Sequence, residues 1–370
     1  MSTPLDPLVV SEVRLAMVPG VGPRTRLALL AELGSPQAVL GAGRSRLLQV
    51  AGVGPKLADK ILAAGELDAE GELATACRHG IRVLLPSADG YPRALREVHD
   101  PPAVLFTRGD LLAGDQIAVA LVGSRHATRY GLEQAERLGQ ELARAGVTVV
   151  SGLARGIDAA AHRGALAAGG RTLAVLAGGL LKLYPPEHRG LAEDVVANGC
   201  LIAEAPPRMP PMSGSFPQRN RVISGLSLGV VVVEAANRSG ALITARHAGE
   251  QGREVFAVPG PVTSRLSRGC HGLIRDGAKL VAGVDDILEE LGPLIEAVPK
   301  PGGGETRSVA ELGLNDVEQR VLQAIGAVAT EVDRVVQESG VPVHRVLATL
   351  SVLEMKRLVR RVSGALVARV

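Results

Sequence analysis

The chain has 370 residues, a length that suits two or three domains better than one. Hydrophobic residues make up 46% and charged residues 21%, so the composition excludes a disordered chain. The formal net charge is only +3, and the chain has three Tyr, three Phe and no Trp. These numbers exclude a broad aromatic stacking platform for nucleic acid, and the charge alone does not indicate a DNA-binding protein.

The cysteines and the start of the chain argue for an ordinary cytoplasmic protein. Cys77, Cys200 and Cys270 form no CxxC pair, so we expect neither a disulfide framework nor a metal site. Residues 1–14 lack a basic stretch followed by an apolar one, and no apolar run reaches about 18 residues. We expect no membrane contact and no cofactor.

Changes in periodicity divide the chain into three units and a linker. We expect a helical domain at residues 1–95 and an α/β domain at residues 96–291. Residues 292–307 contain the stretch PKPGGG, which is typical of a linker. Residues 308–370 then form a small separate domain.

The first unit contains an internal repeat. The sequences VPGVGP at residues 18–23 and VAGVGP at residues 50–55 lie 32 residues apart, each before a helical run. Paired glycines between short helices predict helix-hairpin-helix motifs, whose exposed amide groups favour a phosphate. Alternatively, the glycines only let two helices pack closely. The secondary DNA contacts that this motif suggests are Gly20, Gly22, Gly52, Gly54 and Lys56.

The second unit alternates apolar runs of strand length with helical patterns. This alternation predicts strands buried on both faces, and hence a doubly wound parallel sheet. A seventh short strand is expected near Lys279–Val281. The six main runs are Ile117–Val122, Val147–Val150, Thr172–Leu176, Cys200–Ala203, Leu228–Val233 and Glu254–Val258.

The loop after the first of these strands carries Gly123, Ser124 and Arg125. Amide groups at the start of a helix and a guanidinium group suit an anion such as phosphate. The loop matches neither GxGxxG nor a Walker A motif, so it gives no support to a dinucleotide or ATP site.

The second strand leads into Ser151, Asp158 and His162, a set that suggests a hydrolase. Asp158 and His162 are four residues apart on one helix, so we expect them to pair with each other or to brace neighbouring loops. No GxSxG motif is present. We therefore predict no catalytic residue.

The segment FPQRNRVISG at residues 216–225 combines a ring, two arginines and two amides. Phe216 can stack a base, Arg219 and Arg221 can contact phosphates, and Gln218 and Asn220 can contact base edges. The alternative is that Phe216 is a core residue and the arginines are solvated.

The last unit predicts helices at Val317–Ile325, Thr330–Glu338 and Val343–Leu353, followed by a hairpin. This order is that of a winged helix. The third helix offers few polar side chains, so sequence-specific regulation is weakly supported. Arg360 and Arg361 in the hairpin are better suited to phosphates or to a protein partner.

Five stretches, in order, resemble the DNA-processing protein A family (DprA, also called Smf). They are GSRHATRYG at 123–131, SGLARGIDAAAH at 151–162, FPQRNRVISGLS at 216–227, VVVEAANRSGALITARHA at 231–248 and GREVFAVPG at 252–260. The helical repeat resembles the SAM-like domain that precedes this core in many members, and the C-terminal unit resembles their winged helix. One departure is His271, which stands where Asn is usual.

The resemblance implies an extended Rossmann-like core that binds single-stranded DNA, protects it during natural transformation and loads the RecA recombinase onto it. It implies a phosphate site at Gly123, Ser124 and Arg125, completed by Ser239 and Gly240. It also implies that Arg219, Asn220 and Arg221 line the path of the strand, with Phe216 at a base. The family forms homodimers through the later part of the core, which here places Leu273 and Ile274 at the interface.

Two other classes of function remain to be weighed. A nucleotide-cleaving phosphoribohydrolase uses a similar sheet with a PGGxGTxxE loop, but here Glu234 precedes the turn and the motif is missing. A transcription factor that uses only the winged helix would leave the five core stretches without a purpose. Whether duplex DNA also binds is left open.

Overall fold

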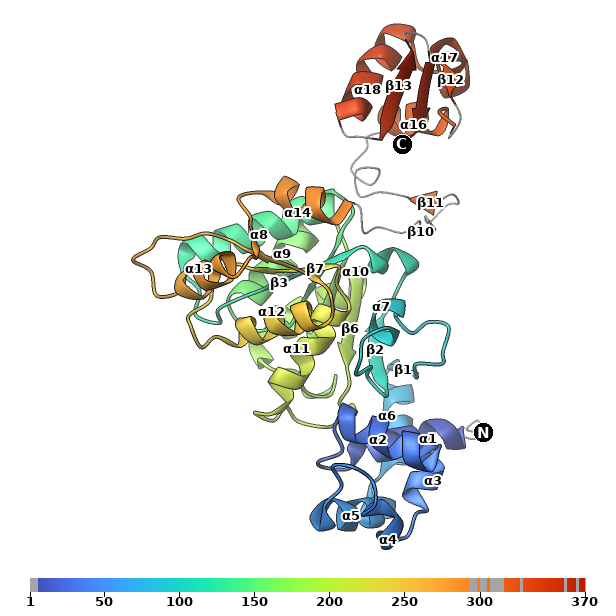
Figure 1. Ribbon diagram of the computed structural model, residues 1–370, viewed down its shortest axis with the longest axis vertical. Helices are drawn as coiled ribbons and strands as arrows, with labels where there is room; N and C mark the ends of the chain where they lie inside the picture. Colours follow the sequence, from blue (N-terminus) through green and yellow to red (C-terminus); the bar gives the residue numbers. More distant parts are fainter. Residues whose placement is uncertain are drawn as a thin grey trace.

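The structure is a computed structural model that describes most of the chain. The described residues are 6–292, 298–299, 305–306, 316–326, 329–355, 358–363 and 366–369. Figure 1 shows a helical domain, an α/β core and a small C-terminal unit. Most of the linker expected at residues 292–307 lies outside the described residues.

The helical domain consists of short helices, several of which begin with proline. Proline is the first residue of α1, α2, α3 and α5, where its missing N–H costs nothing. The elements are α1 (Pro7–Met17), α2 (Pro23–Leu33), α3 (Pro36–Leu40), α4 (Arg44–Leu47), α5 (Pro55–Leu62), η1 (Ala63–Glu66) and α6 (Ala69–Arg78). The predicted tandem of hairpins is confirmed, with one hairpin before α2 and the other before α5.

The helical domain is packed directly on the core. Val13 of α1 and Leu73 of α6 belong to the same buried cluster as Phe106, Leu176 and Leu201 of the sheet. Burial of shared apolar surface fixes the two units to each other.

Nine strands form one sheet in the order β1-β2-β6-β5-β4-β3-β7-β8-β9. The strands from β3 to β9 pair in parallel, whereas β2 is antiparallel to β6 and β1 is antiparallel to β2. Their bounds are β1 (Arg82–Leu84), β2 (Leu105–Gly109), β3 (Ala118–Val122), β4 (Thr148–Ser151), β5 (Thr172–Leu176), β6 (Gly199–Ala203), β7 (Gly229–Val232), β8 (Glu254–Ala257) and β9 (Lys279–Leu280).

The six main strands and the short seventh are confirmed. The two antiparallel strands were not predicted, and β1 falls inside the range expected to be helical, so the boundary at residue 95 is wrong for residues 82–84. Three residues are too few to show a strand periodicity, and β1 forms because β2 offers it a free edge.

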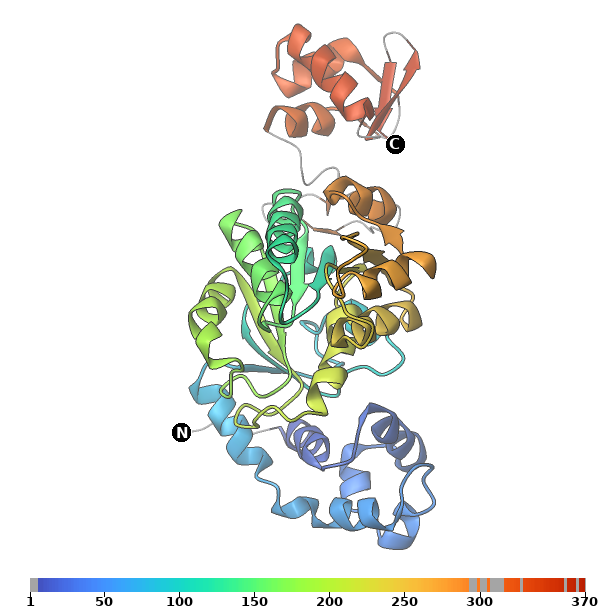
Figure 2. The same ribbon diagram turned by 90° about the vertical axis from the view of Figure 1, so that its left-hand side faces the viewer.

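Helices cover both faces of the sheet, as Figure 2 shows. Along β3, Ala118 and Ala120 face the cluster that contains α11 and α12, whereas Val119 and Leu121 face α8 and α9. The helices are α7 (Arg93–Arg96), α8 (Arg129–Arg144), α9 (Ile157–Ala167), α10 (Arg189–Asn198), α11 (Ser215–Gly225), α12 (Gly240–Glu250), α13 (Arg268–Arg275) and α14 (Val284–Leu291). Two single turns of 3₁₀ helix, η2 (Ala113–Gln116) and η3 (Pro186–His188), complete the core.

The strand order places a crevice at the centre of the sheet. From β3 the chain moves outward through β4, β5 and β6, then returns to β7 on the other side of β3. Ligands of doubly wound sheets bind at such a reversal, beyond the carboxyl ends of the strands. The loops after β3 and β7 flank this point.

The C-terminal unit is a winged helix, as predicted. It contains α16 (Asp316–Gln323), β12 (Thr330–Glu331), α17 (Val332–Ser339), α18 (Val343–Met355), β13 (Val359–Ser363) and β14 (Leu366–Arg369). The second helix begins two residues later than expected because Thr330 and Glu331 pair with β14. A further pair of two-residue strands, β10 (Val298–Pro299) and β11 (Glu305–Thr306), precedes it.

The solvent face of α18 mixes apolar and polar side chains. Val343 and Leu347 are 52% and 45% exposed, while Val346 and Leu350 are buried in the core of the unit. His344, Arg345, Ser351 and Glu354 are exposed as well. That the third helix is a poor sequence reader stays a prediction.

In the part of the chain that the structure describes, no helix has the length and the apolar character needed to span a bilayer.

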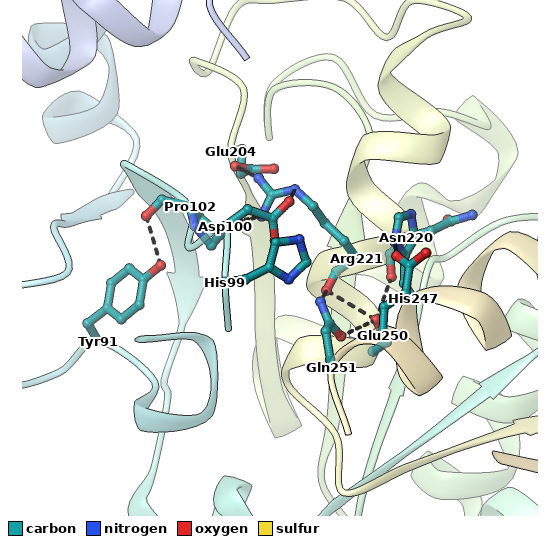
Figure 3. A network of polar contacts seen from close by, with 11 residues as sticks. Tyr91, His99, Asp100, Pro102, Glu204, Asn220, Arg221, His247, Glu250 and Gln251 are labelled. Carbon is teal, nitrogen blue, oxygen red and sulfur yellow. Dashed lines mark hydrogen bonds and ion pairs between the residues drawn. The ribbon is translucent and has the colours of Figure 1, made fainter. Parts of the chain in front are cut away.

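The buried guanidinium group of Arg221 anchors helix α11 to the segments next to β2 and β6. Arg221 is 4% exposed, forms an ion pair with Glu204 after β6, and donates to the carbonyl oxygen of Asp100 before β2. Gln251 at the end of α12 donates to the carbonyl oxygen of Arg221 at 3.0 Å and accepts from Ser224 at 2.6 Å. Figure 3 shows these contacts converging on Arg221 from several elements.

Removing this guanidinium should destabilise the core. In Arg221→Met the carboxylate of Glu204 is left without its partner. We expect the free energy of unfolding to fall by about 3 kcal/mol. Urea denaturation measures the loss, and adding Glu204→Gln to this variant should restore part of it. The matched control is Arg246→Met, because Arg246 is 77% exposed and its pair with Glu250 is worth little. Equal effects of Arg221→Met and Arg246→Met would contradict the assignment.

His162 should make the stability of the core depend on pH. Burial, together with the nearby His188 and Arg219, lowers the pKa of His162 to about 3. Below pH 6.5 the unfolded chain binds a proton that the folded chain does not, so stability falls as the pH drops from 6.5 towards 3. We expect a loss of about 2 kcal/mol between pH 7 and pH 5 from this residue.

The measurement compares urea midpoints at pH 7 and pH 5 for the wild type and His162→Gln. The variant should lose less stability at pH 5 than the wild type does, and the exposed His344 gives the control variant His344→Gln. If His162→Gln has the same pH dependence as the wild type, the buried neutral histidine is not its source.

Candidate nucleic-acid interface

The loop after β3 is tightly packed up to Arg125. A side chain at Gly123 would lie 2.5 Å from Ile157, so only glycine fits. The amide of Ser124 donates to the carbonyl oxygen of Glu234 at 2.8 Å. The expectation that this amide receives a phosphate is therefore wrong, because its hydrogen is already used. Arg125 is exposed and is the part of this loop that is free to contact a ligand.

Arg125 lies over an aromatic ring of α11. Its guanidinium carbon is 4.6 Å from the centre of the Phe216 ring. Phe216 in turn contacts Tyr184 edge to face, with ring centres 6.1 Å apart, and Arg155 lies 5.8 Å from the centre of the Tyr184 ring. We call Arg125, Phe216, Tyr184 and Arg155 the Arg–aromatic cluster.

The cluster gathers side chains from the loops after β3, β4 and β5 and from the start of α11. Phe216 is half-buried and Tyr184 is 45% exposed, so both side chains are partly accessible to solvent. Lys182 lines the same narrow pocket. Cations attract phosphates and aromatic faces stack bases, so this cluster can bind both parts of a nucleotide chain.

The loop between β4 and α9 is held in an uncommon backbone conformation. Leu153 has φ = 56°, and this costs a residue other than glycine about 1–3 kcal/mol. The turn persists because the Leu153 side chain is fully buried and His188 Nδ1 lies 2.9 Å from its carbonyl oxygen. It directs Arg155 towards Tyr184.

Arg219 lies beneath the cluster and not along an open path. It is 7% exposed, and its Nη1 donates to the carbonyl oxygens of Gly152 and Val175 at 2.7 and 2.6 Å. A Cβ at Gly152 would lie 1.9 Å from that nitrogen, so the guanidinium group packs on the glycine. Arg219 thus joins the ends of β4 and β5 and forms the floor of the site.

The floor contains two buried ionisable groups, Arg219 and Asp158, which affect each other's pKa. Burial lowers the pKa of Arg219, and Asp158 opposes that effect. Burial also raises the pKa of Asp158, against the influence of Arg219 and of the amide of Ala154. Each group therefore makes the burial of the other less costly.

The other predicted residues of α11 point in different directions because residues 215–225 form a helix. Gln218 is exposed, and the side-chain amide of Asn220 donates to the carbonyl oxygen of Gly240 at 3.1 Å. Arg221 points into the buried network of Figure 3, where it pairs with Glu204. The expectation that Arg221 lines the path of the strand is therefore wrong: its charge is used inside the protein.

A wider cavity of about 480 Å³ lies at the reversal of the sheet. Gly123, Ser124 and Arg125 line one side, and Ser239 and Gly240 line the other, so the predicted loops do meet. Ser239 is the N-cap of α12 and accepts from the amide of Ala241 at 3.3 Å. Phe216 and Arg219 line both this cavity and the narrow pocket.

The residues that suggested a hydrolase make hydrogen bonds that hold neighbouring strands and loops. The Ser151 hydroxyl donates to the carbonyl oxygen of Leu121 at 2.6 Å, and His162 contacts the Thr172 hydroxyl at 2.7 Å. Asp158 braces its own loop and does not pair with His162, so the second of the two interpretations is confirmed.

The carboxylate of Glu234 also has structural hydrogen-bond partners. Its carboxylate accepts from the amide and the hydroxyl of Thr128 at 2.8 and 2.6 Å. This contact fixes the start of α8 against β7, which is a structural role.

The remaining predicted residues lie outside the cluster. Arg360 and Arg361 are exposed on β13, and Leu273 and Ile274 on α13 are partly buried against the core. Sequence reasoning missed Arg155, Lys182 and Tyr184 as site residues. The available signal was their position after β4 and β5, in loops that follow parallel strands.

Comparison with protein families gives three matches along the chain. The DNA recombination-mediator protein A model matches residues 82–292, a SAM-like helix-hairpin-helix tandem matches residues 12–64, and a DprA winged helix domain matches residues 305–365. Protein Smf of Escherichia coli is 38% identical over 322 residues, covering 87% of this chain and 86% of that protein. A putative DNA processing protein DprA of Mycobacterium tuberculosis is 40% identical over 353 residues, covering 91% and 88%.

Two solved structures share the fold. DNA processing protein A of Streptococcus pneumoniae superposes with a TM-score of 0.65 at 34% identity, covering 76% of this chain and 97% of that one. The Helicobacter pylori protein, described for its single-stranded DNA binding mode, gives a TM-score of 0.52 at 29% identity, with 57% and 95% covered. The chain therefore belongs to the DNA recombination-mediator protein A (DprA) family.

Proposed function

We propose that this protein binds single-stranded DNA, without sequence preference, across the Arg–aromatic cluster. The observation that carries the proposal is a pair of contacting rings, each with a guanidinium group over it, Arg125 on Phe216 and Arg155 on Tyr184, at one pocket. The Helicobacter pylori relative, described as binding single-stranded DNA, supports it.

The chemistry of the cluster favours unpaired DNA. A ring can stack on a base only when the base leaves its duplex partner, and every base has a face to stack. Arginine and lysine contact phosphates, which are the same for every sequence. Single-stranded DNA of any sequence can therefore bind both the rings and the cations of the cluster, whereas a duplex offers only phosphates to the cations.

The proposed role is that of a non-enzymatic DNA-processing factor in natural transformation. The bound strand is protected and handed to the RecA recombinase. The contacts of Ser151, His162 and Glu234 support a role without catalysis, since each is committed to holding a loop or strand. The winged helix, with exposed Arg360 and Arg361, is a second surface for phosphates or for a protein partner.

Replacing Arg125 tests the DNA site. We expect Arg125→Ala to weaken binding of oligothymidylate and of a mixed-sequence strand alike, by about tenfold, because a phosphate contact and a cation–π contact are lost. The slope of log affinity against log salt should also become shallower by about 0.7. Fluorescence anisotropy titrations at several salt concentrations measure both.

The matched control is Arg129→Ala. Arg129 lies on the first turn of α8, is 91% exposed and pairs with Glu133, outside the cluster. Its removal should leave affinity and salt slope nearly unchanged. Equal losses in the two variants would show that the affinity comes from surface charge in general and would refute the site.

We further propose that the protein forms a homodimer through α13. Leu273 and Ile274 are partly exposed there, and the neighbouring strand β9 exposes Leu280 by 46%. Exposed apolar groups close to one another favour an interface.

A charge in this face should separate the dimer. We expect Ile274→Glu to be monomeric at concentrations where the wild type is dimeric, measured by size-exclusion chromatography with light scattering. Val343→Glu, on the exposed face of α18, serves as the control for an added carboxylate. A dimer in Ile274→Glu, or its loss in both variants, would place the interface elsewhere.

A further inference from the structure

The narrow pocket at the Arg–aromatic cluster is much smaller than the cavity beside it. Its volume is about 20 Å³, against about 480 Å³ for the cavity at the reversal of the sheet. A space of this size takes one small group, such as a water molecule or the oxygen of a phosphate, and no nucleobase. Four of the residues that line it carry a positive charge, namely Arg125, Arg155, Lys182 and Arg219.

The floor of this pocket is packed. Gly152 follows β4, Gly178 follows β5, and both are buried together with Leu176 and Arg219. Neither glycine has room for a side chain, because a Cβ would lie 1.9 Å from Nη1 of Arg219 at position 152 and 2.7 Å from the backbone nitrogen of Pro211 at position 178. A group that enters between the exposed side chains of the rim therefore meets a closed end.

The rim of the pocket has more positive charge than the protein neutralises. No carboxylate is among the described residues that line it. In the part of the chain that the structure describes, Arg125 and Lys182 form no ion pair, and both are exposed. Arg155 pairs with Glu187, but the two side chains are 48% and 47% exposed, so this pair is weak and leaves the guanidinium group available.

Arg219 contributes charge to the floor more than it contributes hydrogen bonds, because its Nη1 already donates to two carbonyl oxygens. Burial is the main cause that lowers the pKa of Arg219; Asp158 opposes it, and the charge of Arg125 adds to the lowering. The two guanidinium groups thus repel each other across the pocket. An anion between them would reduce this repulsion.

The closed end of the pocket distinguishes two kinds of phosphate. An internal phosphate of a strand continues into the chain on two sides, so a closed pocket would have to admit both. A terminal phosphate is attached on one side only, and it carries a charge of about −1.5 to −2 at pH 7, whereas an internal phosphate carries a single charge. A narrow pocket with a closed floor and unneutralised cations therefore fits the end of a strand better than its middle.

We propose that the narrow pocket binds the terminal phosphate of a single-stranded DNA, with Lys182 and Arg155 at its rim and Arg219 at its floor. The ligand group is a phosphate monoester, which a strand can carry at its 5′ or its 3′ end. This inference rests on the proposed function. It adds a preference for phosphorylated ends to a site that does not distinguish sequences.

Short oligothymidylates with different ends test the proposal. Strands of about four nucleotides carry a 5′-phosphate, a 3′-phosphate or hydroxyl groups at both ends. A hydroxyl-ended strand that is about two nucleotides longer matches the charge of the phosphorylated strands. In competition titrations followed by fluorescence anisotropy, we expect one phosphorylated strand to bind about tenfold more tightly than this charge-matched strand. The end that gives the tighter binding identifies the end that enters the pocket.

The substitution Lys182→Gln removes a cation that lines the narrow pocket and not the wider cavity. We expect this variant to lose most of the preference for the phosphorylated strand and to keep nearly the wild-type affinity for the hydroxyl-ended strand. The matched control is Lys60→Gln, because Lys60 is exposed on α5 of the helical domain, outside the cluster. Thermal unfolding checks that both variants fold as well as the wild type.

Equal affinities of the wild type for the phosphorylated strands and the charge-matched strand would overturn the inference. It would also be overturned if Lys182→Gln kept the full preference, or if Lys60→Gln lost as much of it. The proposed function fails by a different result, in which Arg125→Ala keeps full affinity for long hydroxyl-ended strands.

Discussion

The architecture of the binding surface depends on the guanidinium group of Arg219. It donates to the ends of two neighbouring strands, β4 and β5, and it lies on the bare backbone of Gly152. The loops that carry Arg155 and Tyr184 begin at these strand ends, so their positions follow from this one contact. A charge buried in this way needs a counter-charge, and Asp158 supplies it.

Above this floor, the cations of the cluster are already in place. The contact with Phe216 restrains the side chain of Arg125, so in the proposed complex this side chain would lose less conformational freedom when a strand binds. In the proposed site, the exposed cations would contribute to affinity beside rings that also stack bases. A protein with 2% aromatic residues can bind single strands when two of its few rings are placed at one pocket.

The parallel strands, the tandem hairpins and the winged helix could be predicted because apolar runs, glycine pairs and helical periodicity are local patterns, whereas the order of the strands in the sheet was not predicted. The meeting of Gly123–Arg125 with Ser239 and Gly240 also followed, since both loops leave the same edge of the sheet. The burial of Arg221 in ion pairs could not be predicted. Its partners Glu204 and Asp100 come from distant segments, and a helix turns each side chain of residues 215–225 in its own direction.

The contact between Gly152 and Arg219 ties together two positions that are 67 residues apart in the chain. Any side chain at position 152 would occupy the space of the guanidinium nitrogen, and a shorter residue at position 219 would leave two carbonyl oxygens without a donor. Substitutions at the two positions are therefore coupled: a side chain at position 152 requires the guanidinium group to move, and the ends of β4 and β5 then need another donor.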